Sequence, residues 1–134
     1  MRADAKTASE IESLVAATYE AMSTPGTDME TFFGAADIAI VGSGQGEIWH
    51  GPDQAVGAAT VVSSWGLRWT AEEIIVWSLG DVAWSQILGA VHVVRDGVDE
   101  LVPYTTTGVF TRGDDGEWRW AYWGGSEPQE DAKV

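Results

Sequence analysis

The alternation of apolar and polar residues is most regular between Asp81 and Trp123, and it predicts two long antiparallel hairpins. Residues 81–95 are apolar and β-branched, and Asp96-Gly97 supplies the residue types that a two-residue hairpin turn favours. A tight turn there places Trp84 opposite Val109 and Gln86 opposite Thr107.

A second hairpin follows, because residues 99–112 end in a turn over 113–116 and the segment EWRWAYWGG returns as a third strand. In this register Trp120 lies beside Val109, and Tyr122 lies beside Thr107. One face is then expected to hold Trp84, Gln86, Leu88, His92, Leu101, Thr105, Thr107, Val109, Trp118, Trp120 and Tyr122. The other is expected to hold Ala83, Ile87, Val91, Val93, Val102, Tyr104, Phe110, Ala121 and Trp123. Both faces are apolar, so both need cover.

Helical spacing dominates the first half of the chain. A capping box at Thr7-Ala8-Ser9-Glu10 predicts a helix that ends at Thr24-Pro25-Gly26, after a loose tail over residues 1–6. A short helix over about 27–33 and a third from Gly51-Pro52-Asp53 to Trp65 follow the same logic. Strands are predicted over 37–42, 47–50 and 67–79, and the segment past Pro128 is expected to be disordered.

Early helices and late strands indicate an α+β fold in which three helices cover the concave face of a curved antiparallel sheet of about six strands. The whole chain, 1–134, is expected to be one domain with an ordered core over about 8–127. The outer sheet face has no helix left to cover it. We therefore expect a homodimer through that face, with Ala83, Ile87, Val91, Val102, Phe110 and Trp123 at the interface.

The amino-acid composition excludes several kinds of site and partner. The chain has no cysteine, so thiolate metal sites and thiol nucleophiles are excluded, and we expect no cofactor. A formal net charge of −14 argues against nucleic-acid and anionic-membrane partners. No apolar run is long enough to cross a bilayer and the first residues form no apolar signal segment, so a cytoplasmic location is expected. Eight tryptophans suggest a thick aromatic core or an aromatic-lined pocket.

The segment from Ile40 to Ala55, IVGSGQGEIWHGPDQA, resembles the G-T-x-x-x-E-x-W-x-G-x-x-A segment of SnoaL-like proteins, in the superfamily of ketosteroid isomerase and nuclear transport factor two. The start of the first hairpin at 80–84 and the turn at 115–119 are similar to the same group. The resemblance covers roughly 8–127. It implies a cone-shaped α+β barrel with a deep pocket between helices and sheet, commonly as a homodimer. It leaves the activity open, because this fold hosts isomerases, cyclases, dehydratases, hydrolases and non-enzymatic domains.

Two departures from that family bear on catalysis. The resemblance places the ketosteroid isomerase general base at Gly42, which cannot act as a base. Many relatives also carry two histidines near the end of the last strand, where this chain has Tyr122 and Gly124. An acid–base reaction would therefore need other residues.

Three residues are candidates for catalysis. Glu47 lies beside Trp49. A carboxylate held against an aromatic surface has a raised pKa that suits proton transfer. The alternative is that Glu47 is a surface carboxylate or a partner for a backbone N–H. His50 could act as an acid or base at the pocket mouth, or could cap the following helix. Tyr122 could donate a hydrogen bond to a ligand oxygen. His92 is read as a rim residue near the hairpin turn.

Six residues are candidates for ligand binding. Gln86 and Thr107 are polar positions on an aromatic strand face, which favours either a wet pocket or a cross-strand hydrogen bond. Tyr19 reaches in from the first helix, while Trp49, Trp84 and Trp120 would form aromatic walls or simply core. A flat hydrophobic ligand should then quench tryptophan fluorescence. Trp120→Ala should weaken that binding, and Trp123→Ala should disturb the dimer.

The sequence thus predicts a SnoaL-like protein with an apolar, Trp-lined pocket for a small hydrophobic molecule. Acid–base chemistry of the isomerase, cyclase or dehydratase type is one hypothesis. A non-catalytic ligand-binding or dimerisation module of the same fold is the other.

Overall fold

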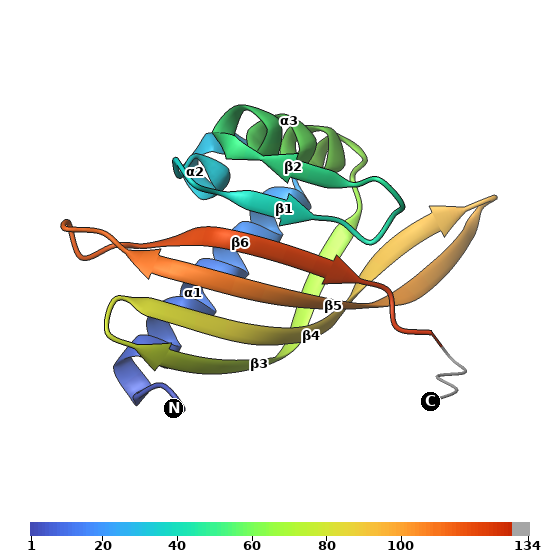
Figure 1. The fold of residues 1–134 in the computed structure, drawn as a ribbon. Coiled ribbons are helices and arrows are strands. Elements are labelled where there is room, and N and C mark those ends of the chain that lie inside the picture. The colour runs from blue at the N-terminus through green and yellow to red at the C-terminus, as the bar shows by residue number, and fades with distance from the viewer. Residues whose placement is uncertain (130–134) are drawn as a thin grey trace.

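The computed structural model describes residues 1–129, and its strands form one curved, unclosed sheet with helices on one side (Figure 1). The helices are α1 (Ala5–Met22), α2 (Glu30–Phe33) and α3 (Gly51–Ser64). The strands are β1 (Ala39–Val41), β2 (Ile48–His50), β3 (Arg68–Leu79), β4 (Val82–Arg95), β5 (Val98–Arg112) and β6 (Trp118–Ser126). The α+β class, three helices and six strands agree with the prediction.

The first hairpin has the predicted register. Asp96 and Gly97 both have positive φ, 51° and 76°, as a turn that matches the twist of long strands requires. Arg95 pairs with Val98, and the pairing continues without interruption along β4 and β5. The residue types of one turn therefore fixed the alignment of the two longest strands.

The strand order is β2-β1-β6-β5-β4-β3. All neighbours are antiparallel except β1 and β6, which pair in parallel from Ala39 beside Tyr122 to Val41 beside Gly124. The predicted antiparallel sheet is therefore confirmed for every pair of neighbouring strands except this one. Strand β2 and helix α3 separate β1 from the long strands in sequence, so β1 can join the β6 edge in either direction.

The second hairpin departs from the predicted register. Its loop is longer than expected, so Phe110 rather than Val109 lies opposite Trp120, and an irregularity at Ala121 then sets Val109 opposite Tyr122. Because one extra residue moves a side chain to the opposite face, Trp120 and Trp123 both point to the helix side, while Tyr122 points outward. The prediction that Trp120 and Tyr122 share a face is wrong for this reason.

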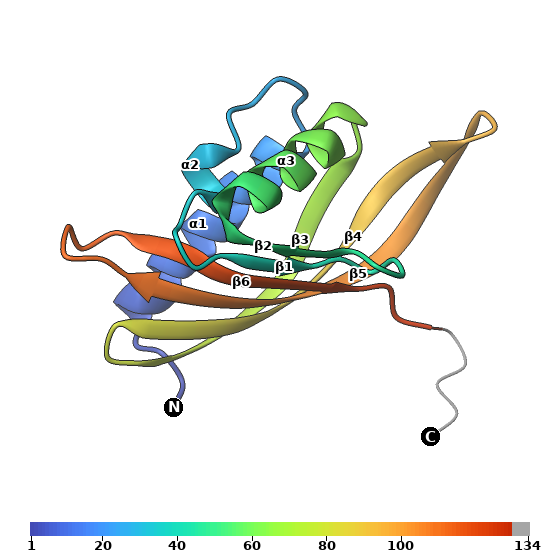
Figure 2. The ribbon, with the colours of Figure 1, turned by 45° about the horizontal axis from the view of Figure 1, so that its top comes forward.

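The helices cover the opposite face from the one expected. The side chains buried on the helix side include Ala83, Ile87, Val91, Tyr104 and Phe110. Helix α1 runs across this face of the sheet (Figures 1 and 2). This face is the more apolar of the two. Packing it under the helices leaves the face with Gln86 and Thr107 outside, where water can hydrogen-bond their polar groups.

The first residues are ordered and do not form a loose tail. The N–H of Ala3 donates to the Val76 carbonyl, which places the N-terminal segment along the β3 edge. The N-cap of helix α1 lies three residues before the predicted one at Thr7, because Asp4 accepts the Thr7 N–H at 2.8 Å and caps the helix. The expected disorder beyond Pro128 falls largely on residues 130–134, outside the described residues.

Two buried hydrogen bonds fix α1 on the sheet. The Trp120 indole N–H donates to the Thr18 hydroxyl at 2.9 Å, and the Tyr19 and Thr106 hydroxyls are 2.8 Å apart. Burial raises the pKa of Tyr19 to about 12, against the opposing effect of its Thr106 hydrogen bond. A polar core group costs little when it is paired in this way, and each pair specifies one helix position.

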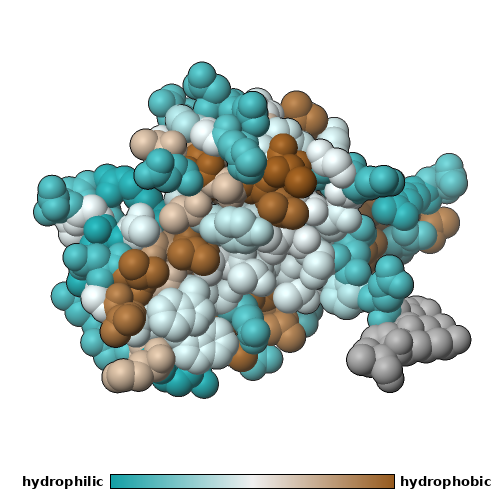
Figure 3. Space-filling model, in the orientation of Figure 1, coloured by the Kyte–Doolittle hydropathy of each residue, from teal (hydrophilic) through white to brown (hydrophobic). Residues whose placement is uncertain are grey.

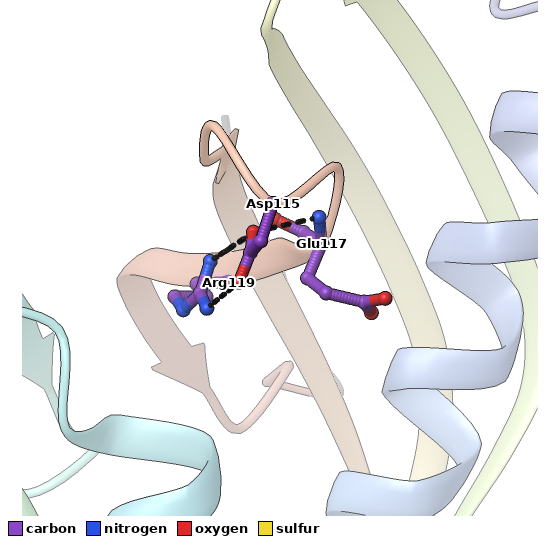
Figure 4. A network of polar contacts seen from close by, with 3 residues as sticks. All are labelled: Asp115, Glu117 and Arg119. Carbon is purple, nitrogen blue, oxygen red and sulfur yellow. Dashed lines mark hydrogen bonds and ion pairs between the residues drawn. The ribbon is translucent and has the colours of Figure 1, made fainter.

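The β5–β6 turn is held by an ion pair on the surface (Figure 4). Asp115 accepts from the Glu117 N–H at 3.0 Å and from both terminal guanidinium nitrogens of Arg119, one of them at 3.1 Å. The Arg119 side chain and the Glu117 N–H hold the pKa of Asp115 down at about 2.

We expect this depressed pKa to be measurable. A carboxyl whose pKa is lower in the folded chain adds stability above its unfolded pKa, and that stability is lost as pH falls toward about 2. In Arg119→Ala the Asp115 pKa should return toward the ordinary value, as carboxyl NMR titration would show. An unchanged pKa in the variant would mean that the ion pair does not hold this turn in solution.

Within residues 1–129, none of the helices is both long enough and apolar enough to span a membrane. Over the same residues, no group of three or more histidine, aspartate or glutamate side chains is arranged to hold a metal ion.

Candidate functional site: an aromatic cavity between α3 and the sheet

The cavity is lined by residues of α3, of the β1–β2 turn and of the part of β4 and β5 near their connecting turn. Figure 2 shows this end of the β4–β5 hairpin projecting from the rest of the sheet. The volume of the cavity is about 190 Å³. Small residues of α3, among them Ala58 and Ala59, leave room on one side, and the β1–β2 turn closes another. The lining residues are Met22, Phe33, Ile40, Gly42, Ser43, Glu47, Trp49, Ala58, Ala59, Val62, Trp65, Leu67, Trp69, Val91, Val93, Arg95, Val102, Tyr104, Trp123 and Glu127.

Aromatic rings form much of the cavity wall. Trp69 meets Tyr104 edge to face, with ring centroids 4.9 Å apart, and lies 6.2 Å from Trp123. Trp49 adds a further ring from β2. Rings held against one another in this way give a rigid apolar surface suited to a planar or apolar ligand.

The polar side of the cavity begins at the β1–β2 turn. The Gly42 N–H donates to the Glu47 carbonyl at 2.8 Å, and the Glu47 carboxylate folds back to accept the Gly44 N–H. A Cβ on Gly42 would lie only 2.9 Å from that carboxylate, so glycine is needed for the fold-back. The turn therefore holds an acidic group at the cavity wall, and only one of its two oxygens is hydrogen-bonded within the described residues.

Tyr104 brings a hydroxyl to the same part of the cavity. Burial raises its pKa, and the negative charges of Glu47 and Glu127 add to the shift, while Ser43 and Trp123 oppose it. A raised pKa keeps the hydroxyl protonated and able to donate a hydrogen bond. The hydroxyl has room because residue 125 is glycine; a Cβ there would overlap it.

The cavity lining contains two carboxylates, Glu47 and Glu127, and one guanidinium, Arg95, and only the guanidinium has an oppositely charged partner among the described residues. Within residues 1–129, Glu127 accepts one long hydrogen bond, from the Ser43 hydroxyl at 3.4 Å. Arg95 lies 3.6 Å from Glu100, a neighbour on the same hairpin, so its charge is partly compensated. In the described part of the chain, neither lining carboxylate is in an ion pair.

The predicted site residues divide between the two faces. Glu47 and Trp49 line the cavity. Tyr19 does not reach it, although its ring packs 5.8 Å from Trp123 and 5.9 Å from Trp69. His50 is exposed at the start of α3, where its backbone N–H, rather than its imidazole, bonds to Gln54.

The other predicted residues lie away from the cavity. Trp84, Gln86, Thr107 and Tyr122 are on the outer sheet face, so the expectation that they share the concave face is wrong. Trp120 is on the concave face but is fully buried beneath α1, against Phe110 at 4.5 Å and Trp123 at 4.9 Å. Its position is that of core and not of cavity wall.

Trp123 is the clearest correction. Sequence reasoning placed it at a dimer interface, yet it lines the cavity together with Trp69 and Tyr104. The other residues predicted at that interface, Ala83, Ile87, Val91, Val102 and Phe110, also point toward the helix side. One signal in the sequence could have corrected both errors, since the face with fewer polar residues is the one that should be covered.

The fold is that of the superfamily of nuclear transport factor two. A Salmonella enterica protein of that superfamily superposes with a TM-score of 0.80 at 13% identity, over 98% of this chain and 97% of its own. A Streptomyces avermitilis protein of the NTF2-like family, whose name proposes a dehydratase, gives 0.77 at 17% identity, over 92% and 97%. The CaMKII hub of S. rosetta gives 0.73 at 15%, over 90% and 96%.

The sequence matches the SnoaL-like domain family over residues 11–130, so the chain belongs to that family. This agrees with the resemblance seen in the β1–β2 segment. None of the curated protein sequences is significantly similar to the chain.

Proposed function

We propose that the protein binds a small, largely apolar molecule in the cavity between α3 and the curled end of the sheet. One observation carries the proposal: an apolar, aromatic-walled cavity with a few polar groups gathered at one side is the usual form of a small-molecule site. Its volume of about 190 Å³ suits a ligand with one aromatic ring and a short substituent, since engineered cavities of ~150 Å³ take up benzene.

Acid–base chemistry, if the site performs it, would use Glu47 and Tyr104. Of the three residues considered for catalysis, only Glu47 lines the cavity, and its second carboxylate oxygen could accept a proton from a bound ligand. Tyr104 would donate a hydrogen bond to a ligand oxygen as charge develops there. Glu47→Gln should then abolish turnover of a neutral substrate while retaining its binding. Binding without turnover in the unaltered protein would favour the non-catalytic hypothesis.

Filling the cavity should abolish ligand binding. Ala58→Phe places a ring in the space that the ligand would occupy, so titration with 2-phenylethanol should no longer quench tryptophan fluorescence. Thr60→Phe is the matched control, because Thr60 is an exposed position of α3 outside the cavity lining and should leave binding within about twofold of the original. Equal quenching in both variants would place the ligand elsewhere.

We also propose a homodimer through the outer sheet face. Figure 3 shows apolar and weakly polar residues across the strands, with hydrophilic residues around them. Leu88 and Tyr122 are 39% and 36% exposed there, beside the half-buried rings of Trp77 and Trp84. No helix covers this face within residues 1–129. Two of the similar structures are named as an association domain and a hub, which supports assembly.

A charge placed on this face should prevent the assembly. Leu88→Glu should convert a dimer to a monomer in sedimentation at micromolar concentration, since an interface of on the order of 1,200 Å² tolerates no unpaired buried charge. Val61→Glu adds the same charge at an exposed α3 position and should leave the dimer intact. A monomer in the unaltered protein would rule this proposal out.

A further inference from the structure

We infer that the cavity selects a small aromatic molecule carrying a positively charged amine, which deepens the proposed function and rests on it. The observation behind this inference is the pairing of an indole-rich wall with carboxylates that make no ion pair within residues 1–129. Trp49, Trp69 and Trp123 line the same cavity as Glu47 and Glu127. The chemical class is an arylalkylamine in its ammonium form.

The carboxylates supply the first part of the argument. The Ser43 hydroxyl, which lies in the same β1–β2 turn as Glu47, is 3.4 Å from the Glu127 carboxylate, so both carboxylates belong to one side of the cavity. In this contact the Ser43 hydroxyl donates a hydrogen bond to the Glu127 carboxylate. The Gly44 N–H donates one to the Glu47 carboxylate. A bound anion would face two negative charges here, whereas an ammonium group would find two acceptors.

Arg95 is the single basic group of the lining among residues 1–129, and it does not reverse this preference. Arg95 is 3.6 Å from Glu100, and its side chain is 60% exposed, so solvent and its neighbour compensate much of its charge. Counting Glu47, Glu127 and Glu100 against Arg95, the local charge remains negative. The chain as a whole carries a formal net charge of −14, which raises the concentration of cations near its surface.

The aromatic wall supplies the second part of the argument. An ammonium group within about 6 Å of an indole face is attracted by the ring quadrupole, and tryptophan is the best such partner. Four of the chain's eight tryptophans, Trp49, Trp65, Trp69 and Trp123, line this cavity together with Tyr104. The same rings accept the apolar part of the ligand, so one site can hold both ends of a molecule of this class.

Three probes of nearly equal size test the inference: phenethylammonium, neutral 2-phenylethanol and anionic 3-phenylpropanoate. Affinities are measured by fluorescence titration and calorimetry at neutral pH and low salt. Phenethylammonium should bind at least about tenfold more tightly than 2-phenylethanol, and 3-phenylpropanoate should bind most weakly. Raising the salt concentration should reduce the advantage of the ammonium probe and leave the alcohol unaffected.

Variants that replace a carboxylate with a neutral amide show which residues cause the preference for the ammonium probe. Glu47→Gln and Glu127→Gln should each lower the ratio of ammonium to alcohol affinity by roughly three- to tenfold while leaving the alcohol affinity nearly unchanged. Glu117→Gln removes one charge from an exposed position outside the cavity and should leave the ratio unchanged. This control separates the local carboxylates from the net charge of the chain.

Two results overturn the inference, and they are distinct. If the alcohol binds as tightly as the ammonium probe, or if neither Glu47→Gln nor Glu127→Gln changes the ratio, the cavity binds small molecules without selecting cations. If none of the three probes binds and Ala58→Phe changes nothing, the proposed function itself fails together with the inference.

Discussion

Trp120→Ala is expected to lower the free energy of unfolding by about 3–5 kcal/mol, the range for removing a large aromatic side chain from a core. The Trp120 side chain is fully buried and packs against Phe110 and Trp123. Its indole N–H also donates to Thr18 of α1, so the substitution leaves both a cavity and a disturbed helix contact. Chemical denaturation followed by circular dichroism measures the loss.

The matched control is Trp65→Ala. Trp65 is 59% exposed at the end of α3, so its removal should cost less than about 1 kcal/mol. A loss of under 1 kcal/mol for Trp120→Ala would contradict the burial of this ring between α1 and the sheet. Trp120→Phe should fall between the two, because it keeps one aromatic ring in the core but loses part of the indole volume and the hydrogen bond to Thr18.

Gly89→Ala should destabilise the fold by about 2–3 kcal/mol, although it adds a single methyl group. Strand β3 has an irregularity between Ala71 and Glu73, and this brings the Thr70 carbonyl directly over Gly89 of β4. A Cβ at residue 89 would overlap that oxygen, and it would lie only 3.1 Å from the Ala71 Cα. Because these are backbone atoms, the two strands would have to separate locally to admit the methyl group.

Gly57→Ala is the opposite case and serves as the control. Gly57 lies within α3, and nothing stands within 4 Å of a Cβ there. Alanine should therefore stabilise the helix by about 0.5–1 kcal/mol through its higher helix propensity. Thermal unfolding of the two variants should move in opposite directions; a shift of the same sign in both would show that the β3–β4 contact at Gly89 is not as described.

The fold could be predicted from sequence because strong local signals agree with one another. Asp96-Gly97 fixed the first hairpin, and the pattern of early helices and late strands fixed the layers. The parallel β1–β6 pairing could not be predicted, since a strand of three residues carries no pattern that indicates its direction or partner. The helix start could not be predicted either, because both Asp4 and Thr7 are suitable N-cap residues. In the structure Asp4 is the N-cap, and the hydrogen bond from Ala3 to Val76 of β3 fixes the chain just before it.

The site was less predictable, because it depends on which side of a strand faces the helices. A single irregularity at Ala121 carries Trp123 to the concave face and Tyr122 to the outer one, and no residue type in the sequence marks it. Tyr104 and Trp69 were not predicted as cavity residues. Tyr104 was missed because it was assigned to the outer face of the sheet. Glu47 and Trp49 were found because they belong to a short segment whose turn glycines and family resemblance both drew attention to them.

The most direct test of the proposed cavity follows the indole N–H resonances of the eight tryptophans by NMR during titration with phenethylammonium and with 2-phenylethanol. A ligand between α3 and the sheet should shift the resonances of the four tryptophans that line the cavity, Trp49, Trp65, Trp69 and Trp123. Trp77 and Trp84, on the outer face, should keep their positions. Shifts confined to Trp77 and Trp84 would contradict the account, because the small-molecule site would then lie on the outer sheet face.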